Sequence, residues 1–149
     1  MQKIYPVDIA THPFAVRCPI QMRFNDQDSF AHVNNGSQQS YFDIGRQQYV
    51  EEMYGIDFYR LPRTLILVSY TTDFISQITL DNKIEVCSSV YKIGNRSLRM
   101  IQAIFDINTH HLFTVEDSVL AAVDRTKGES FLIPDDWRER IQRMEKVLL

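Results

Sequence analysis

The chain has 149 residues, the length of a single domain that can bury a sizeable core. Its net charge is −3 with no basic run, so nucleic acid is not a predicted partner. No apolar stretch approaches the roughly 18–20 residues that a membrane-spanning helix needs. The first eight residues lack an apolar core and include Pro6 and Asp8, which argues against a signal peptide. We therefore expect a cytoplasmic protein with no membrane contact.

The residues that usually bind metals or form disulfides are scattered. Cys18 and Cys87 each lie inside a strand-like run, which is typical of small buried hydrophobic residues. His12, His110 and His111 have no acid or cysteine partners at metal-ligand spacing. The sequence therefore predicts neither a disulfide framework nor a metal site.

The chain begins with a short arm, residues 1–13, that contains two prolines. Apolar residues then occupy every second position across residues 14–24, which predicts a half-buried strand. Pro19 lies within this run and has no backbone N–H to donate, so one side of the strand is expected to be an edge or a bulge.

A polar turn at residues 25–32 separates this strand from a predicted long helix. Asn34 or Asn35 is a suitable N-cap, and Gly55 ends the helix after about Tyr54. Apolar residues lie on most sides of the helix, which predicts that it is buried. Gly45 lies in the middle of the helix despite its propensity cost.

Between residues 63 and 125 the apolar residues alternate in four successive runs, which predicts four strands. The polar turns at residues 80–83, 93–96 and 108–111 suit hairpins, so we expect an antiparallel meander. Asp117 falls on the apolar side of the last strand, which indicates a bulge or a second interface there. A short amphipathic helix is predicted from Pro134 onward.

One strand, one long helix and four strands indicate an α+β domain, in which a five-stranded antiparallel sheet wraps around one central helix. The whole chain, residues 1–149, forms this single domain. The sheet edges stay open, so pairing with a second copy is expected.

The turn before the helix gathers two carboxylates, a histidine, two asparagines and a glycine where backbone amides are free. Such a corner suits chemistry on a small anion or a carbonyl group. The alternative is that Asp26 and Asp28 merely form or cap the turn, as most acids in turns do.

The turn and the first part of the helix resemble a motif of a known family. The matching positions lie in the turn and on the helix: Arg23, Asp26, Gln27, Asp28, His32, Val33, Asn34, Asn35, Tyr41, Phe42, Asp43 and Arg46. They resemble the hotdog-fold acyl-CoA thioesterases of the 4-hydroxybenzoyl-CoA thioesterase type. Residues 92–97 resemble that family's Gly-x-x-Ser turn, and residues 134–137 resemble its Pro-x-x-Trp ending.

The resemblance implies that Asp28 is the catalytic carboxylate, acting as nucleophile or as general base for water. The backbone amides from Asn34 to Gly36 would polarise the thioester carbonyl. Gly94 and Ser97 of a neighbouring subunit would line the pantetheine arm or the nucleotide. No metal or bound cofactor is implied, since coenzyme A is part of the substrate.

Further residues have two interpretations each. His32 could act as a base, and Asn34 and Asn35 could contact the substrate, but all three are expected to support the loop. Tyr41 and Tyr70 would line an acyl tunnel or pack in the core. Lys92 and Arg96, together with Arg125, would meet coenzyme A phosphates or be solvated charges at strand ends.

The sequence departs from the family at Ala31, where glycine is usual, and at Gln38 and Gln39 in the wall of the acyl pocket. We predict a thioesterase that hydrolyses an acyl-CoA or acyl-carrier-protein thioester as a homodimer or a dimer of dimers. The alternatives are a non-catalytic hotdog module that binds acyl thioesters or a partner protein, and a dehydratase that uses His32.

Overall fold

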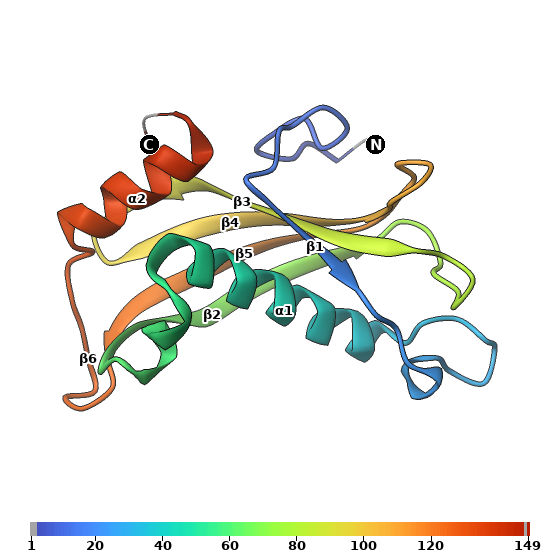
Figure 1. The fold of residues 1–149 in the computed structure, drawn as a ribbon, viewed down its shortest axis with the longest axis horizontal. Coiled ribbons are helices and arrows are strands. Elements are labelled where there is room, and N and C mark those ends of the chain that lie inside the picture. Colours follow the sequence, from blue (N-terminus) through green and yellow to red (C-terminus); the bar gives the residue numbers. More distant parts are fainter. Residues whose placement is uncertain (1–2, 148) are drawn as a thin grey trace.

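In the computed structural model, which describes residues 3–147 and 149, one long helix lies against a curved antiparallel sheet (Figure 1). The strands are β1 (Val16–Ile20), β2 (Arg63–Phe74), β3 (Ile84–Ile93), β4 (Ser97–Asp106), β5 (Leu112–Asp124) and the short β6 (Glu129–Ser130). The helices are α1 (Asn35–Tyr54) and α2 (Asp135–Glu145), with 3-10 turns η1 (Phe24–Asp26) and η2 (Ile56–Arg60). The predicted hotdog architecture, with its short C-terminal helix, is confirmed.

The order of strands in the sheet is β1-β3-β4-β5-β2, and every pair is antiparallel. The hairpins β3–β4 and β4–β5 form as predicted. The predicted meander is wrong for β2, which pairs with β5 at the far edge instead of with β3. The polar turn at residues 80–83 therefore closes no hairpin. It belongs to a crossing loop that is anchored by the fully buried Ile78, whose carbonyl accepts the Val33 amide.

The first strand is shorter than its alternating pattern predicts. β1 pairs with β3 only from Val16 to Ile20, and Pro19 is tolerated because β1 is an edge strand. The alternation continues to Phe24, but Phe24 lies in η1 and is 78% exposed. The chain leaves the ladder there because the Asp26 amide and side chain both bond back to Arg23.

Helix α1 begins and ends where the sequence predicts. The Asn34 side chain caps it by accepting the Gly36 amide at 2.7 Å, and Gly55 follows its last residue with φ 125°. The expectation that α1 is buried on most sides is wrong, since Ile44 is 45% exposed. The sheet covers only one face of the helix, and the residues buried on that face are Gln38, Tyr41, Phe42, Gly45, Arg46, Tyr49, Val50 and Met53.

Gly45 explains how closely α1 approaches the sheet. A Cβ atom at this position would lie 2.6 Å from Val86 Cγ1 and 2.8 Å from Gln102 Nε2, which is closer than atoms can pack. The hydrogen of glycine removes this clash. Gln102 can then donate to the Phe42 carbonyl in the preceding turn of the helix, at 3.1 Å.

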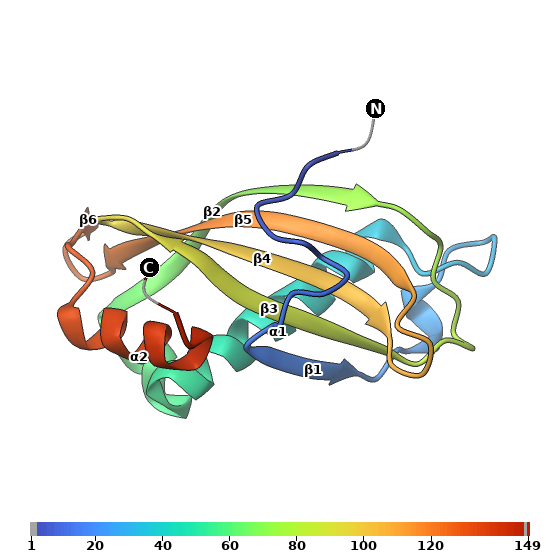
Figure 2. The same ribbon diagram turned by 90° about the horizontal axis from the view of Figure 1, so that it is seen from above.

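The remaining elements, α2 and the N-terminal arm, pack on α1 and on part of the second face of the sheet. Helix α2 packs through the buried Trp137 and Ile141 against the C-terminal half of α1, as its amphipathic pattern predicts. The arm crosses the sheet on the face away from α1, where Ile9 and Phe14 are buried (Figure 2).

We predict that Gly45→Ala destabilises the protein, although alanine is the better helix former. Overpacking costs about 1–3 kcal/mol, whereas the gain in helix propensity is at most about 1 kcal/mol. Urea unfolding followed by circular dichroism measures the difference. Ser40→Ala, on the exposed face of the same helix, is the control and should lose no stability. A Gly45→Ala variant as stable as the parent would contradict the close packing.

Candidate active site

The turn that precedes α1 is held by Asp26, which is buried. Its carboxylate accepts the Tyr41 hydroxyl at 2.6 Å and the Arg23 amide at 3.0 Å. Burial disfavours the charged form, but the hydrogen bonds from Tyr41 and Arg23 outweigh it and lower the pKa of Asp26. The Asp26 carbonyl also accepts the Asn34 amide at 2.8 Å. Asp26 is therefore an ionised anchor of the turn.

Asp28, in contrast, is exposed. Its Oδ1 atom accepts the backbone amides of Phe30 at 2.8 Å and His32 at 3.2 Å, which fixes the direction of the side chain. Its backbone amide donates to the His32 carbonyl at 2.7 Å. The Oδ2 atom accepts no hydrogen bond from any of the residues described. The turn thus holds one carboxylate oxygen and leaves the other available.

The amides at the start of α1 are not all free. The Asn34 amide donates to Asp26 and the Gly36 amide donates to the Asn34 side chain. Of the three predicted carbonyl-polarising amides, Asn35 alone donates to no acceptor within residues 3–147 and 149. It lies at the positive end of the helix dipole, where negative charge is stabilised.

These groups share a cavity of about 380 Å³. Its lining is formed by the turn, the first residues of α1 and the segment that follows β2: Asp28, His32, Val33, Asn35, Gln38, Phe74, Ile75, Ser76 and Gln77. The structure therefore brings together the predicted Asp28, His32 and Asn35. The segment 74–77 was missed, since nothing in its composition signals a site and only the pairing of β2 with β5 places it here.

A second cavity of about 470 Å³ lies farther along the groove between α1 and β2. Its lining is mostly apolar with a polar side from α1: Asp43, Arg46, Gln47, Val50, Tyr59, Leu65, Leu67 and Leu120. Tyr70, 50% exposed, lies on β2 between the two cavities. Asn35 in one cavity and Val50 in the other are about 22 Å apart along the helix.

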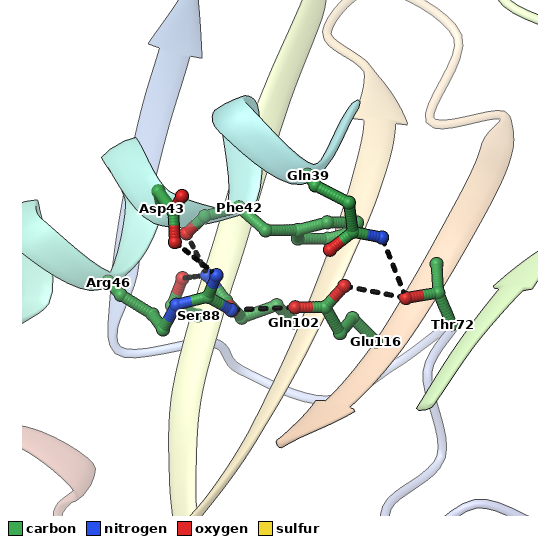
Figure 3. A network of polar contacts seen from close by, with 8 residues as sticks. All are labelled: Gln39, Phe42, Asp43, Arg46, Thr72, Ser88, Gln102 and Glu116. Atoms are coloured by element: carbon green, nitrogen blue, oxygen red, sulfur yellow. Dashed lines mark hydrogen bonds and ion pairs between the residues drawn. The ribbon is translucent and has the colours of Figure 1, made fainter. Parts of the chain in front are cut away.

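A buried polar network lies beneath this groove (Figure 3). Arg46 donates to Glu116 Oε1 at 2.6 Å, to Gln102 Oε1 at 2.9 Å and to Asp43 Oδ1 at 2.5 Å. Thr72 on β2 donates to the other oxygen of the fully buried Glu116, at 2.6 Å. The network thus connects α1 to β4, β5 and β2.

The other predicted substrate contacts lie elsewhere. Tyr41 is buried, and its hydroxyl donates to Asp26, so it helps to hold the turn. Gly94, Ser97, Lys92 and Arg96 belong to the β3–β4 hairpin, at the end of the molecule opposite the turn that carries Asp28 (Figure 1).

Two of the predicted phosphate-binding cations already have partners. Arg96 donates to the Ser130 carbonyl at 3.0 Å, and Arg125 donates to the carbonyls of Tyr59 and Leu61. Within the part of the chain that the structure describes, no group of three or more His, Cys, Asp or Glu residues could hold a metal ion. No helix in that part is long and apolar enough to cross a membrane.

A sequence model described as the thioesterase-like superfamily matches residues 22–141. No curated protein matches the chain.

Solved structures match the fold over most of their length. A thioesterase from Thermus thermophilus, complexed with coenzyme A and Zn, shares 24% identity over 93% of this chain and 100% of its own, with a TM-score of 0.82. A Staphylococcus aureus protein in complex with CoA shares 12% identity over 89% of this chain and 85% of its own, with a TM-score of 0.80. A 1,4-dihydroxy-2-naphthoyl-CoA thioesterase from Synechocystis shares 12% identity over 84% and 93%, with a TM-score of 0.73. At these identities the similarity establishes the fold.

The backbone of the turn is strained at Ala31, whose φ of 61° lies in the left-handed region. An L-residue in this conformation costs about 1–2 kcal/mol. We therefore predict that Ala31→Gly raises the free energy of unfolding by about 1 kcal/mol, because glycine adopts this φ without strain.

Thermal and urea unfolding test the Ala31→Gly prediction. Ala10→Gly is the matched control, since Ala10 is exposed and its φ is not positive, so this change should give no gain. Equal effects of the two substitutions would contradict the strain at Ala31.

Proposed function

Since the chain belongs to the thioesterase-like superfamily, we propose that it hydrolyses an acyl thioester of coenzyme A or of an acyl carrier protein to a carboxylic acid and a thiol. The observation that carries the proposal is the position of Asp28. One of its oxygens is fixed by backbone amides, the other accepts no hydrogen bond from the described residues, and Asp28 lines a cavity that also contains the start of α1.

In the proposed reaction, the thioester carbonyl carbon lies against the free oxygen of Asp28. As a nucleophile, Asp28 forms an acyl anhydride, expels the thiolate and is regenerated by water. As a general base, it takes a proton from the water that attacks the carbonyl. In both routes negative charge develops on the carbonyl oxygen, where the Asn35 amide and the helix dipole would stabilise it.

His32 has a supporting role in this proposal. Its backbone amide and carbonyl both bond to Asp28, so its position in the chain sets the direction of the carboxylate. Asn34 acts one step further away, because its side chain caps the helix that supplies the Asn35 amide.

Coenzyme A is the carrier that the comparisons favour. Two of the similar structures are complexes with coenzyme A, and a third is a thioesterase acting on a coenzyme A thioester. In our proposal coenzyme A enters as part of the substrate, and the chain's own residues carry out the reaction without a resident cofactor.

We predict that Asp28→Asn lowers kcat for thiol release by about 10²–10⁴-fold, the range for loss of a catalytic acid or base. Asparagine keeps an Oδ1 atom that can accept the Phe30 and His32 amides, so the turn and the fold should persist. Thiol release is followed with a thiol-reactive dye across a panel of acyl-CoAs, and circular dichroism checks the fold.

Asp81→Asn, an exposed acid in another turn, is the control and should retain full activity. Unchanged turnover in Asp28→Asn would exclude the proposed role of this carboxylate. Binding of acyl-CoA by the parent without any thiol release would instead favour a non-catalytic acyl-thioester-binding module.

We also propose that the chain forms a homodimer through β2. This strand has an outer edge with which no described strand pairs, and several of its exposed side chains are large and apolar. Val68 is 58% exposed, Tyr70 50% and Phe74 43%. Antiparallel pairing of β2 with β2 of a second copy would satisfy the backbone edge and cover these side chains.

Such a dimer would make the site composite. A twofold axis across β2 places the start of one strand beside the end of the other. The apolar cavity around Leu65 and Leu67 of one copy would then lie next to Asp28 of the other copy. This cavity would be closer to that Asp28 than the equivalent cavity of its own chain. The hairpin with Gly94 and Ser97 would approach that site from the same side.

Mixed dimers test this arrangement. We predict that Leu67→Trp, which fills the apolar cavity, and Asp28→Asn each inactivate their own homodimer. A purified heterodimer of the two variants should recover about half of the parental activity, because one of its two sites combines an intact Asp28 with an intact cavity.

Leu67→Met is the control for Leu67→Trp and should remain active, since it conserves volume. If the cavity and Asp28 of one chain formed the site together, both sites of the heterodimer would be damaged. An inactive heterodimer would therefore contradict the composite site while leaving the role of Asp28 unaffected.

A further inference from the structure

Gln38 is a buried polar residue in the wall of the cavity that contains Asp28. It belongs to α1 and is only 3% exposed. Its Oε1 atom accepts the Thr114 hydroxyl at 2.5 Å. Its Nε2 atom donates to no acceptor in the described part of the chain. A buried amide donor without a partner is unfavourable. The cavity wall therefore has a hydrogen-bond donor that a bound molecule can satisfy.

The neighbours of Gln38 on the helix and on the sheet fix where this donor lies. Gln38 follows Asn35 by three positions, so the two residues share one face of α1. Helical side chains lean toward the start of their helix, which directs the Gln38 amide toward Asn35. On the sheet, Thr114 pairs with Phe74 at the end of β2, and Phe74 lines the same cavity. The Gln38 amide is thus held between the start of α1 and the end of β2.

The charge of the cavity limits which acceptor this donor can bind. Asp28 lines the cavity, and none of the described residues that line it is a lysine or an arginine. A carboxylate or phosphate on the acyl group would be repelled by Asp28 with neither cation to offset the repulsion. The matching acceptor is therefore an uncharged oxygen, such as that of an oxo or a hydroxyl group.

We infer that Gln38 selects acyl groups with an oxo or hydroxyl oxygen near the thioester, an inference that rests on the proposed function. In that proposal the thioester carbonyl lies between Asp28 and the Asn35 amide. Gln38 is about 4.5 Å farther along the helix, roughly the length of two or three carbon–carbon bonds. Its Nε2 atom would donate to an oxygen at the 3-position of the acyl group. A saturated chain of the same length would leave the donor unpaired, and a site built to donate a hydrogen bond discriminates against a ligand without the acceptor.

Three substrates of equal chain length test the selectivity. We predict that the parent prefers acetoacetyl-CoA and 3-hydroxybutyryl-CoA to butyryl-CoA, which lacks the oxygen. Gln38→Met keeps the length of the side chain and removes the donor. It should lower kcat/KM for the two oxygenated substrates, relative to butyryl-CoA, by about 10–100-fold. Thiol release measures these values, and comparing the variant's ratios with the parent's cancels the intrinsic reactivity of each thioester.

Two further variants separate the donor from its anchor. In Gln38→Glu one carboxylate oxygen can still accept the Thr114 hydroxyl, and the other replaces the donating Nε2 atom. This variant should therefore also lose the preference for oxygenated substrates. Gln21→Met makes the same substitution as Gln38→Met at an exposed glutamine elsewhere and should keep the parental preference. Circular dichroism checks that each variant is folded.

Binding provides a second measurement that does not require turnover. In the Asp28→Asn background, calorimetry should show tighter binding of acetoacetyl-CoA than of butyryl-CoA, and adding Gln38→Met should remove the difference. If the parent released no thiol, the proposed hydrolysis would fail, whereas this difference in binding would still support the selectivity.

Three results would overturn the inference. The first is a parent that shows no preference among the three substrates in either measurement. The second is a preference that persists in Gln38→Met or in Gln38→Glu. The third is an equal loss of kcat/KM for all three substrates in Gln38→Met, which would assign the amide to the thioester carbonyl instead of to an oxygen of the acyl chain.

Discussion

The close approach of α1 to the sheet at Gly45 is the constraint on which the rest of the structure depends. With no side chain there, the helix lies near enough for Gln102 to reach the Phe42 carbonyl and for Arg46 to reach Glu116 (Figure 3). These contacts fix the position of the helix along the sheet. The start of α1, and with it the Asn35 amide, is thereby placed at the end of β2 that lines the cavity with Asp28.

Burial of the ion pair between Arg46 and Glu116 costs free energy. The way this cost is offset determines which residues of β5 lie on the outer face of the sheet. Burying two charges is offset only when their hydrogen bonds are satisfied, and Glu116 therefore has Thr72 as a second donor. The side of β5 that faces α1 therefore carries polar residues. Apolar residues of the same strand lie on the outer side, where the arm covers Val115 and leaves Val119 uncovered. The buried polar network and the apolar outer side of the sheet are thus two consequences of one strand.

The candidate site combines a firmly held turn with one exposed carboxylate. Asp26 anchors the turn from its buried position, and Ala31 adopts a left-handed backbone so that the chain can return to the helix. The direction of the Asp28 side chain depends on this backbone path, because the amides of Phe30 and His32 hold its Oδ1 atom. Alanine stands at position 31, where the family resemblance predicts glycine. The backbone at Ala31 nevertheless has the left-handed conformation that glycine favours.

The sequence by itself determined what depends on neighbours in the chain. The N-cap at Asn34, the end of α1 at Gly55 and the convergence of Asp28, His32 and Asn35 all follow from local patterns, because these groups are joined by a short segment. Only the tertiary structure decided which edge β2 occupies, which face of α1 is buried and that segment 74–77 completes the cavity. The physical reason is that strand alternation and polar turns fit several pairings equally well. Contacts between residues far apart in the chain, such as Gln102 with the backbone at Phe42, select one of them.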